Sequence, residues 1–300
     1  METRHLHTAR LKVIAAMAIW GTISLFVKHI AIPSAEIALF RAAIAIVILL
    51  LFKLVTGGKF NREDIRHELL PLLLSGAAMG FNWVLLFEAY RYTTVSVATL
   101  SYYFAPVIVM VLSPILFREH TTWKQRICFI LSTLGLVLVI NVGEISLGDK
   151  NLTGIFFGLG AASLYASVML LNKFCKRVSG IDRTVIQFAA AIAVLLVYVL
   201  LTTGITVLSL DSTGLVNLLI LGTVHTGLCY CLFFSAVRDL PGQEAAILSY
   251  IDPFVSILVS VFILHESMTA LQIAGGVLIL GFTLLNEIDL KPAKKTESFK

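Results

Sequence analysis

The chain has 300 residues, of which 58% are hydrophobic and 14% charged, and its mean hydropathy is +0.92. Soluble domains contain about 45–50% apolar and about 25% charged residues, so this composition excludes an ordinary soluble globular protein. The formal net charge is +5, but no cluster of Lys and Arg is interleaved with aromatic residues, which argues against nucleic-acid binding. The four cysteines lack metal or redox spacing and are expected to be small apolar filling residues.

Apolar runs follow one another along the whole chain, and each is long enough to cross a bilayer as a helix. In chain order the expected spans are 11–30, 34–56, 68–90, 94–117, 122–142, 152–172, 183–203, 213–236, 243–264 and 268–287. The basic N-terminus resembles a signal peptide, but the polytopic chain behind it favours an uncleaved first span. The sequence therefore predicts an all-α integral membrane protein with ten transmembrane helices.

Lys and Arg are concentrated in alternate loops, and this distribution predicts the orientation of the spans. With the N-terminus inside, 19 of these residues fall in inside segments and 3 in outside segments, while Arg41 lies within a span. The bias agrees with the positive-inside rule and supports an even number of spans. We expect a multi-pass protein of the plasma membrane with both termini in the cytoplasm and residues 290–300 as a disordered cytoplasmic tail.

The stretch 101–119 occurs a second time as 248–266. A shift of 147 residues relates the two copies, and the register holds without a gap from about Leu85 to Gln125. The matching pairs include Tyr103 with Tyr250, Pro106 with Pro253, Ser113 with Ser260 and Glu119 with Glu266. Two hydrophobic halves joined in one chain are typical of many transporters.

Each half holds five spans, and because five is odd the second half must enter the membrane upside down. The charges follow this inversion. The loop after the fourth span carries three basic residues, whereas the corresponding positions of the second half are His265, Leu271 and Ile273. We therefore expect two inverted five-helix repeats, residues 1–146 and 147–289.

Two stretches of this chain resemble the paired signature of the drug/metabolite transporter superfamily, EamA type. They are SYYFAPV…LFREHTTWKQ and LSYIDPF…LHESMTALQ. The Phe40–Arg41 pair also resembles the family's pattern, whereas the second half has Phe188–Ala189 there. The resemblance implies ten helices in two inverted halves, a central cavity lined by the first, third, fourth, sixth, eighth and ninth spans, and alternating access. It implies no particular substrate.

A small or polar stripe occurs in the third span and again in the eighth. Its members are Ser75, Ala78, Met79 and Asn82, which a shift of 147 carries to Gly222, His225, Thr226 and Cys229. The spacing places each set on one helical face. Close packing of helices explains such a stripe as well as a cavity wall does. Because a buried polar side chain needs a partner, Asn82 and His225 are the members expected to contact a solute.

Aromatic residues stand deep within several spans. Trp20 and Tyr165 are equivalent under a shift of 145, and Tyr102, Tyr103 and Tyr250 lie one turn or less before the repeated prolines. They can be core residues with satisfied hydroxyl groups. Alternatively they form an aromatic cage or platform, which suits a cation or a flat ring.

Asp252 is an ionisable residue about midway along the ninth span, directly before Pro253, and its repeat counterpart is Ala105. A charged Asp at the bilayer centre costs about 2.5–3.5 kcal/mol on insertion scales, and such residues usually face a cavity. Pro106 and Pro253 are expected to bend their helices and open a polar niche. Asp252 is then either a structural residue, paired or protonated, or a counter-charge for a substrate ammonium or a proton-coupling site.

Arg41 lies near the outer interface of the second span, where Glu36 or Glu88 is expected to pair with it. The alternative is an outer gate or a clamp for a substrate carboxylate. Glu119 and Glu266, at the ends of their spans, are expected to cap turns or form loop ion pairs.

Among function classes, enzymes fit poorly. No two acidic residues at helical spacing share an apolar span, as Mg²⁺-dependent lipid transfer would need, and no P-loop, GxSxG or HExxH motif is present. A channel would show rings of charge or a filter loop. A passive scaffold does not explain an Asp and a His within the membrane.

A secondary active transporter fits best, an exporter or exchanger of small polar or aromatic metabolites such as amino acids. Efflux of drugs or quaternary cations is the alternative, and a channel or intramembrane enzyme is less favoured. We expect no catalytic residue, metal or cofactor. The expected partners are a small-molecule substrate, the lipid bilayer and protons as a candidate coupling ion, with the protein a monomer or weak dimer.

Overall fold

The computed structural model describes residues 2–118, 122–140, 150–178 and 180–288, and every regular element within them is helical. The predicted tail 290–300, the role of Glu119 and the boundary between residues 146 and 147 lie outside the described residues. The all-helical membrane architecture predicted from hydropathy is confirmed for the rest.

The long helices that run from face to face of the bundle are α1 (Glu2–Gly21), α3 (Ser34–Val55), α5 (Leu69–Tyr92), α8 (Trp123–Ile140), α9 (Lys150–Asn172), α10 (Gly180–Thr202) and α15 (Ala270–Glu287). Shorter elements are α2 (Ile23–Val27), α4 (Arg62–His67), α6 (Val95–Tyr102), α7 (Ala105–Phe117), η2 (Val207–Ser209), α11 (Ser212–Gly222), η3 (Thr223–Leu228), α12 (Cys229–Ala236), η4 (Val237–Asp239), α13 (Gly242–Ser249), α14 (Ile251–Leu258) and η5 (Val259–Ile263).

Nine stretches of the described chain are long and apolar enough to cross a membrane. They are Leu6–Val27, Ser34–Val55, Leu69–Tyr92, Val95–Phe117, Trp123–Ile140, Lys150–Asn172, Gly180–Thr202, Ser212–Asp239 and Ala270–Glu287. A tenth apolar stretch, Ile247–Ile263, corresponds to the expected ninth span and is shorter. The ninth span is divided among α13, α14 and the π-helical η5.

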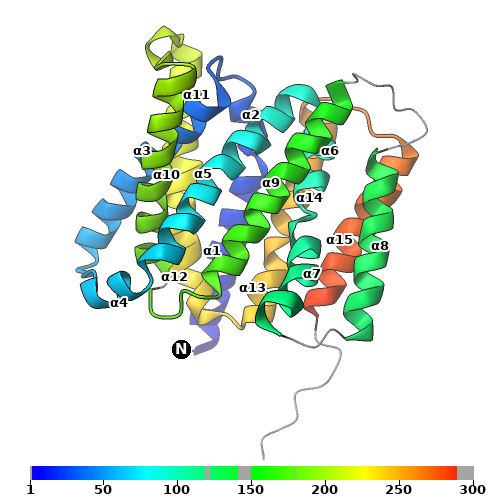
Figure 1. Ribbon diagram of the computed structural model, residues 1–300, viewed down its shortest axis with the longest axis horizontal. Helices are drawn as coiled ribbons and strands as arrows, with labels where there is room; N and C mark the ends of the chain where they lie inside the picture. Colours follow the sequence, from blue (N-terminus) through cyan, green and yellow to red (C-terminus); the bar gives the residue numbers. More distant parts are fainter. Residues whose placement is uncertain (1, 119–121, 141–149, 179, 289–300) are drawn as a thin grey trace, which may run out of the picture.

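Helices from the two halves of the chain pack against each other throughout the bundle (Figure 1). The helix α5 packs on α9 and α10, α8 packs on α15, and α1 packs on α12 and α14. The helix α1 begins and α15 ends on the same side of the bundle, at the bottom of the view. We call this side the N-terminal face and the other side the opposite face.

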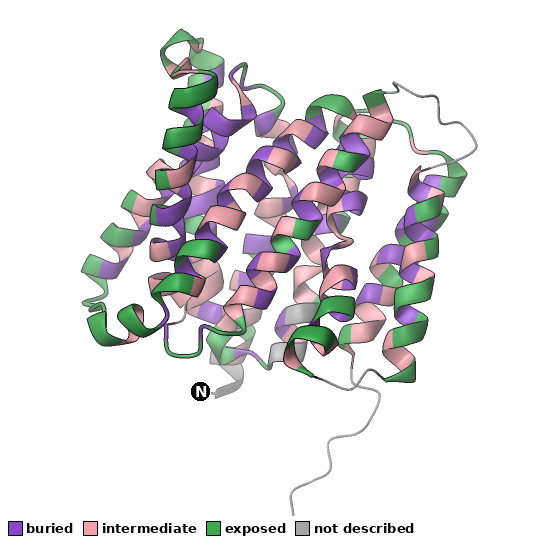
Figure 2. Ribbon diagram, in the orientation of Figure 1, coloured by how far each residue is buried: buried purple, intermediate pink, exposed green. Residues whose placement is uncertain are grey.

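Figure 2 shows exposed residues along the outer faces of α3, α8 and α10. Large apolar side chains of these helices are among the exposed ones. Val55 is 86% exposed and Leu201 is 81% exposed. Water would make such a surface unfavourable, whereas acyl chains cover it without cost, so the exposed face indicates a lipid-facing surface.

The fourth and ninth spans are each interrupted near their middle. The helix α6 ends at Tyr102 and α7 begins at Ala105, while α13 ends at Ser249 and α14 begins at Ile251. In each case a proline of the repeat, Pro106 or Pro253, stands in the first turn of the new helix. A proline is tolerated there because its missing N–H would have no partner within the helix.

The repeat also appears in the backbone. Arg118 and His265 are the two non-glycine residues with positive φ among those described, at 55° and 54°, and they are 147 residues apart. A left-handed residue at this point ends a helix by turning the chain sharply. Both copies therefore leave the fourth and ninth spans through the same local conformation.

Candidate functional site

A cavity of about 500 Å³ lies at the centre of the bundle. The six expected spans all line it, and α3, α10 and α15 contribute as well. Seven of the eight expected substrate-binding residues line its wall: Trp20, Asn82, Tyr102, Tyr103, Tyr165, Tyr250 and Asp252. Arg41 and Pro106 also line it, whereas His225 and Pro253 do not.

The cavity extends to the N-terminal face. Its lining includes Asn172, the last residue of α9, Arg183 near the start of α10, and Glu287, the exposed last residue of α15. All three helix ends lie at the bottom of Figure 1. Toward the opposite face the lining stops at buried residues such as Phe87 and Tyr90.

Asp252 projects from the first turn of α14 into the cavity. Its Oδ2 accepts a hydrogen bond of 2.6 Å from the hydroxyl of Tyr103, the residue at the break of the fourth span. Among the described residues, no Lys, Arg or His lies within 4.0 Å of the Asp252 carboxylate. The two broken spans thus meet at a carboxylate that has a hydroxyl partner and no ion pair.

Arg41 is the buried cation of the site, with 4% of its surface exposed. Its Nε donates to Thr226 Oγ1 at 2.8 Å, and its guanidinium lies 4.5 Å from the ring centre of Trp83 and 5.5 Å from that of Phe87. The described residues place no carboxylate within 4.0 Å of it.

The expected pairing of Arg41 with Glu36 or Glu88 is wrong. Glu36 instead accepts from the Thr206 and Val207 backbone amides, at 2.8 and 3.0 Å, and from the Thr206 hydroxyl, while Glu88 accepts from Arg91 at 3.2 Å. Both acids serve loop or helix-end donors that hydropathy does not reveal.

Aromatic rings form much of the remaining wall. Tyr102 stacks on Tyr165 with ring centres 5.3 Å apart and meets Tyr103 edge to face at 5.6 Å. Trp20 packs edge to face on Tyr230 at 5.2 Å, and its indole N–H donates to the His225 carbonyl at 2.6 Å. Such a wall offers π faces to a cation or an aromatic group.

The stripe predicted in the third span divides between cavity and packing roles. Met79 and Asn82 line the cavity, and Asn82 Nδ2 donates to the Ala161 carbonyl at 2.6 Å. Ser75 instead donates to the Leu72 carbonyl and accepts from Gln187, a cavity residue that the sequence reading missed.

The eighth span turns a different face to the cavity from the expected one. Its lining residues are Tyr230, Phe233 and Phe234. The segment Thr223–Leu228 is a π-helix, in which the number of residues per turn exceeds 3.6. The residues that α-helical spacing would place on one face therefore do not stay on one face here. A Cβ on Gly222 would lie 2.6 Å from Ile44, which indicates close packing against α3 at this position.

His225 lies within this π-helix and is 2% exposed. Its Nε2 is 2.9 Å from Thr22 Oγ1, and its ring packs on Phe26 with centres 4.5 Å apart. The side chain of His225 therefore ties the end of the first span to the eighth span, and its backbone carbonyl orients Trp20.

Comparison with known proteins shows which family and which fold this chain resembles. The EamA-like transporter family matches residues 8–141 and again residues 152–287. An uncharacterized transporter of Bacillus subtilis (strain 168), YxxF, is 28% identical over 259 residues, which are 86% of this chain and 82% of that protein. Protein PecM of Dickeya dadantii (strain 3937) is 25% identical over 288 residues, 93% of each chain. A solved structure with 17% sequence identity superposes at a TM-score of 0.63 over 92% of this chain and 95% of its own.

Proposed function

Because this chain belongs to the EamA-like transporter family, we propose that it is a secondary active transporter of small polar or aromatic metabolites, such as amino acids. It works as an exporter or exchanger by alternating access around the central cavity, in the plasma membrane with both termini cytoplasmic. One observation carries the proposal: the cavity holds a guanidinium, Arg41, and a carboxylate, Asp252, neither ion-paired to a described residue.

A buried charge without a counter-charge is unfavourable, and a solute that brings the opposite charge compensates it. An α-amino acid carries both charges. Its carboxylate would meet Arg41 and its ammonium would meet Asp252, with the aromatic wall left to the side chain. The volume of about 500 Å³ lies within the range of small-molecule sites, roughly 300–1,000 Å³.

We also propose Asp252 as the site where a coupling proton competes with the solute. The Tyr103 hydroxyl donates to the carboxylate and would orient it in either state. A carboxylate that binds a proton in one orientation and a substrate ammonium in the other gives exchange without a separate ion site.

Efflux of quaternary cations is the second candidate. The observation that favours it is the position of Asp252 beside Tyr103, whose ring meets the stacked pair Tyr102 and Tyr165 edge to face. Such a site attracts a permanent cation through both charge and ring faces. The two candidates differ in the need for Arg41, since a quaternary cation has no carboxylate for it to bind.

We propose that residues 1–146 and 147–289 are the two inverted repeats and that the protein is a monomer or weak dimer. The two separate matches of the family, one to each half, support the division. The equal φ angles at Arg118 and His265 support the shift of 147 residues.

The function is tested by a thermal-shift screen of the purified protein against amino acids, nucleosides and quaternary amines, followed by counterflow in proteoliposomes. We expect saturable uptake of the labelled hit that accelerates when unlabelled solute is present on the far side. Asp252→Asn should abolish this exchange. A flux that neither saturates nor accelerates would indicate a channel and would contradict the proposal.

A further inference from the structure

A second pocket of about 310 Å³ lies on the opposite face of the bundle, beyond the closed end of the central cavity. Its lining includes Lys28 and Ser34. Phe87 and Tyr90, both from α5, line this pocket and the central cavity alike. Two aromatic side chains therefore stand between the two spaces.

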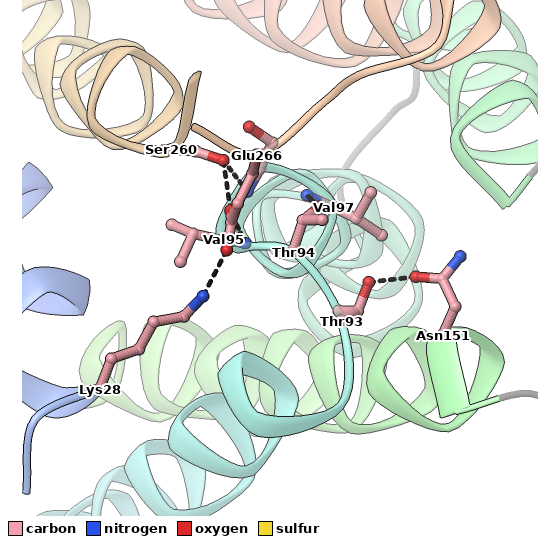
Figure 3. A network of polar contacts seen from close by, with 9 residues as sticks. Lys28, Thr93, Thr94, Val95, Val97, Asn151, Ser260 and Glu266 are labelled. Carbon is pink, nitrogen blue, oxygen red and sulfur yellow. Dashed lines mark hydrogen bonds and ion pairs between the residues drawn. The ribbon is translucent and has the colours of Figure 1, made fainter. Parts of the chain in front are cut away.

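Beside this pocket the carboxylate of Glu266 joins three separate parts of the chain (Figure 3). Glu266 follows η5 at the end of the ninth span. Its Oε1 forms an ion pair with Lys28, which follows α2. Its Oε2 accepts from the Val95 backbone amide at 2.7 Å and from Ser260 Oγ at 2.6 Å. The side chain is 13% exposed, so these contacts are largely shielded from water.

The contact with Val95 caps a helix from outside its own segment. Val95 is the first residue of α6, and its N–H has no acceptor within the helix. A carboxylate at this position satisfies the amide and interacts favourably with the positive end of the helix dipole. The next amide, that of Ser96, donates to Ser260 Oγ at 3.2 Å. The beginning of the fourth span is thus held by residues of the ninth span.

We propose that Glu266 is the residue that holds the central cavity closed on the opposite face, and that the second pocket is the vestibule into which the cavity opens when the Glu266 contacts separate. The inference rests on the alternating access proposed above. Lys28 lines the vestibule, while α5, which carries Phe87 and Tyr90, ends only three residues before Val95. If α6 separates from the ninth span, the end of α5, which carries the two aromatic side chains, is therefore displaced with it.

Glu88→Gln provides a matched control. Glu88 lies near the end of α5 and forms its ion pair with Arg91, three residues away in the same helix. Removal of this carboxylate breaks an ion pair near the same face, but this ion pair lies within one helix and does not connect two spans. Any effect of lost charge alone should therefore be shared by the two variants, whereas opening of the cavity should occur only in Glu266→Gln.

The test measures access to the cavity from the opposite face. Ser24 lines the closed end of the central cavity, and its buried Oγ has no hydrogen-bond partner among the described residues, so Ser24→Cys is a mild reporter. The native cysteines are all buried and can remain. The protein is reconstituted in vesicles, and its orientation is determined with an N-terminal tag. A membrane-impermeant maleimide is then added to the solution that contacts the opposite face of the bundle, and the labelling rate of the reporter cysteine is measured.

We expect slow labelling of the Ser24→Cys protein and roughly tenfold faster labelling after Glu266→Gln, a factor that corresponds to about 1.4 kcal/mol of lost closed-state stability. Glu88→Gln should leave the rate unchanged. Equal rates in both variants would overturn the proposal. If Glu266→Gln unfolds the protein, the buried native cysteines will react with the maleimide. Lys28→Met, which removes only the ion pair, is then the variant to test. An unchanged labelling rate of the reporter in Lys28→Met would refute the proposal that the Glu266 contacts hold the cavity closed. No solute is needed, so the result is independent of the substrate proposed above.

Discussion

Replacement of Arg41 by Gln separates the two candidate substrates and tests whether the guanidinium has a structural role. The guanidinium has no carboxylate partner among the described residues, so its removal strands no buried acid. Thr226 keeps its own hydrogen bond to the Leu221 carbonyl at 2.8 Å. The lost contact with Trp83, about 0.5–2 kcal/mol, is offset by relief of an uncompensated buried charge. We expect the free energy of unfolding to change by no more than about 1 kcal/mol.

Binding should change far more than stability. A hydrogen bond to a charged group contributes about 1.5–3 kcal/mol, so loss of the guanidinium should weaken amino-acid binding roughly 10- to 150-fold. Affinity for a quaternary amine of similar size should be unchanged or higher, because a repelling cation is gone. The assay is isothermal titration or thermal shift in detergent for both ligand classes, with Arg41→Lys as the variant that keeps the charge.

Two results would refute this reasoning. If Arg41→Gln lowers only the amount of folded protein, the residue is structural. If it weakens both ligand classes equally, the guanidinium does not contact a solute carboxylate.

Three further predictions concern particular side chains. Asp252→Asn should abolish or uncouple transport while expression and the melting temperature stay near wild type; wild-type exchange in reconstituted protein would remove Asp252 from the site. Glu68, just before the third span, is buried, which raises its pKa, but the amides of residues 176–178 donate to its carboxylate at 2.7–2.9 Å and hold the pKa below its ordinary value. The stabilisation by Glu68 is therefore complete above its ordinary pKa of about 4.3 and is lost as the pH falls through the depressed pKa. Glu68→Gln should cost about 1–3 kcal/mol at pH 7 and flatten the acid side of the stability profile. Glu63→Gln, on the exposed helix before it, should leave the stability at pH 7 unchanged. A Cβ at Gly275 would lie 2.5 Å from the Gly135 carbonyl, so Gly275→Val should separate α15 from α8 and lower the melting temperature, and an unchanged value would contradict the packing described here.

Features that depend on local chemistry can be predicted from the sequence. The spans follow from hydropathy and length, because backbone within lipid must satisfy its own hydrogen bonds and an apolar run of about 20 residues does so as a helix. The interruptions before Pro106 and Pro253 follow from the missing proline N–H. Asp252 was identified because a carboxylate in an apolar helix is costly unless it faces a polar space.

Contacts between helices that are distant in the chain cannot be predicted in the same way. Arg41 was expected to bond an acid on its own or a neighbouring span, and its hydrogen-bond partner is Thr226, 185 residues away. His225 was placed on the cavity face by counting at helical spacing, and the π-helical turn carries its side chain toward Thr22 instead. Glu266 was expected to cap a turn or form a loop ion pair, and it does form an ion pair with Lys28. Its cap on α6, 171 residues earlier in the chain, is the part that the sequence does not indicate.

The sequence by itself determined that this chain crosses a membrane through paired, repeated sets of helices and that a few charged and aromatic residues lie within them. Only the tertiary structure decided which of these side chains share one cavity, which of the charged ones lack an ion pair to a described residue, and toward which face of the bundle the cavity extends. The physical reason is that lipid and protein interior are both apolar, so hydropathy sets the length of each helix but leaves its rotation about its own axis to side-chain packing.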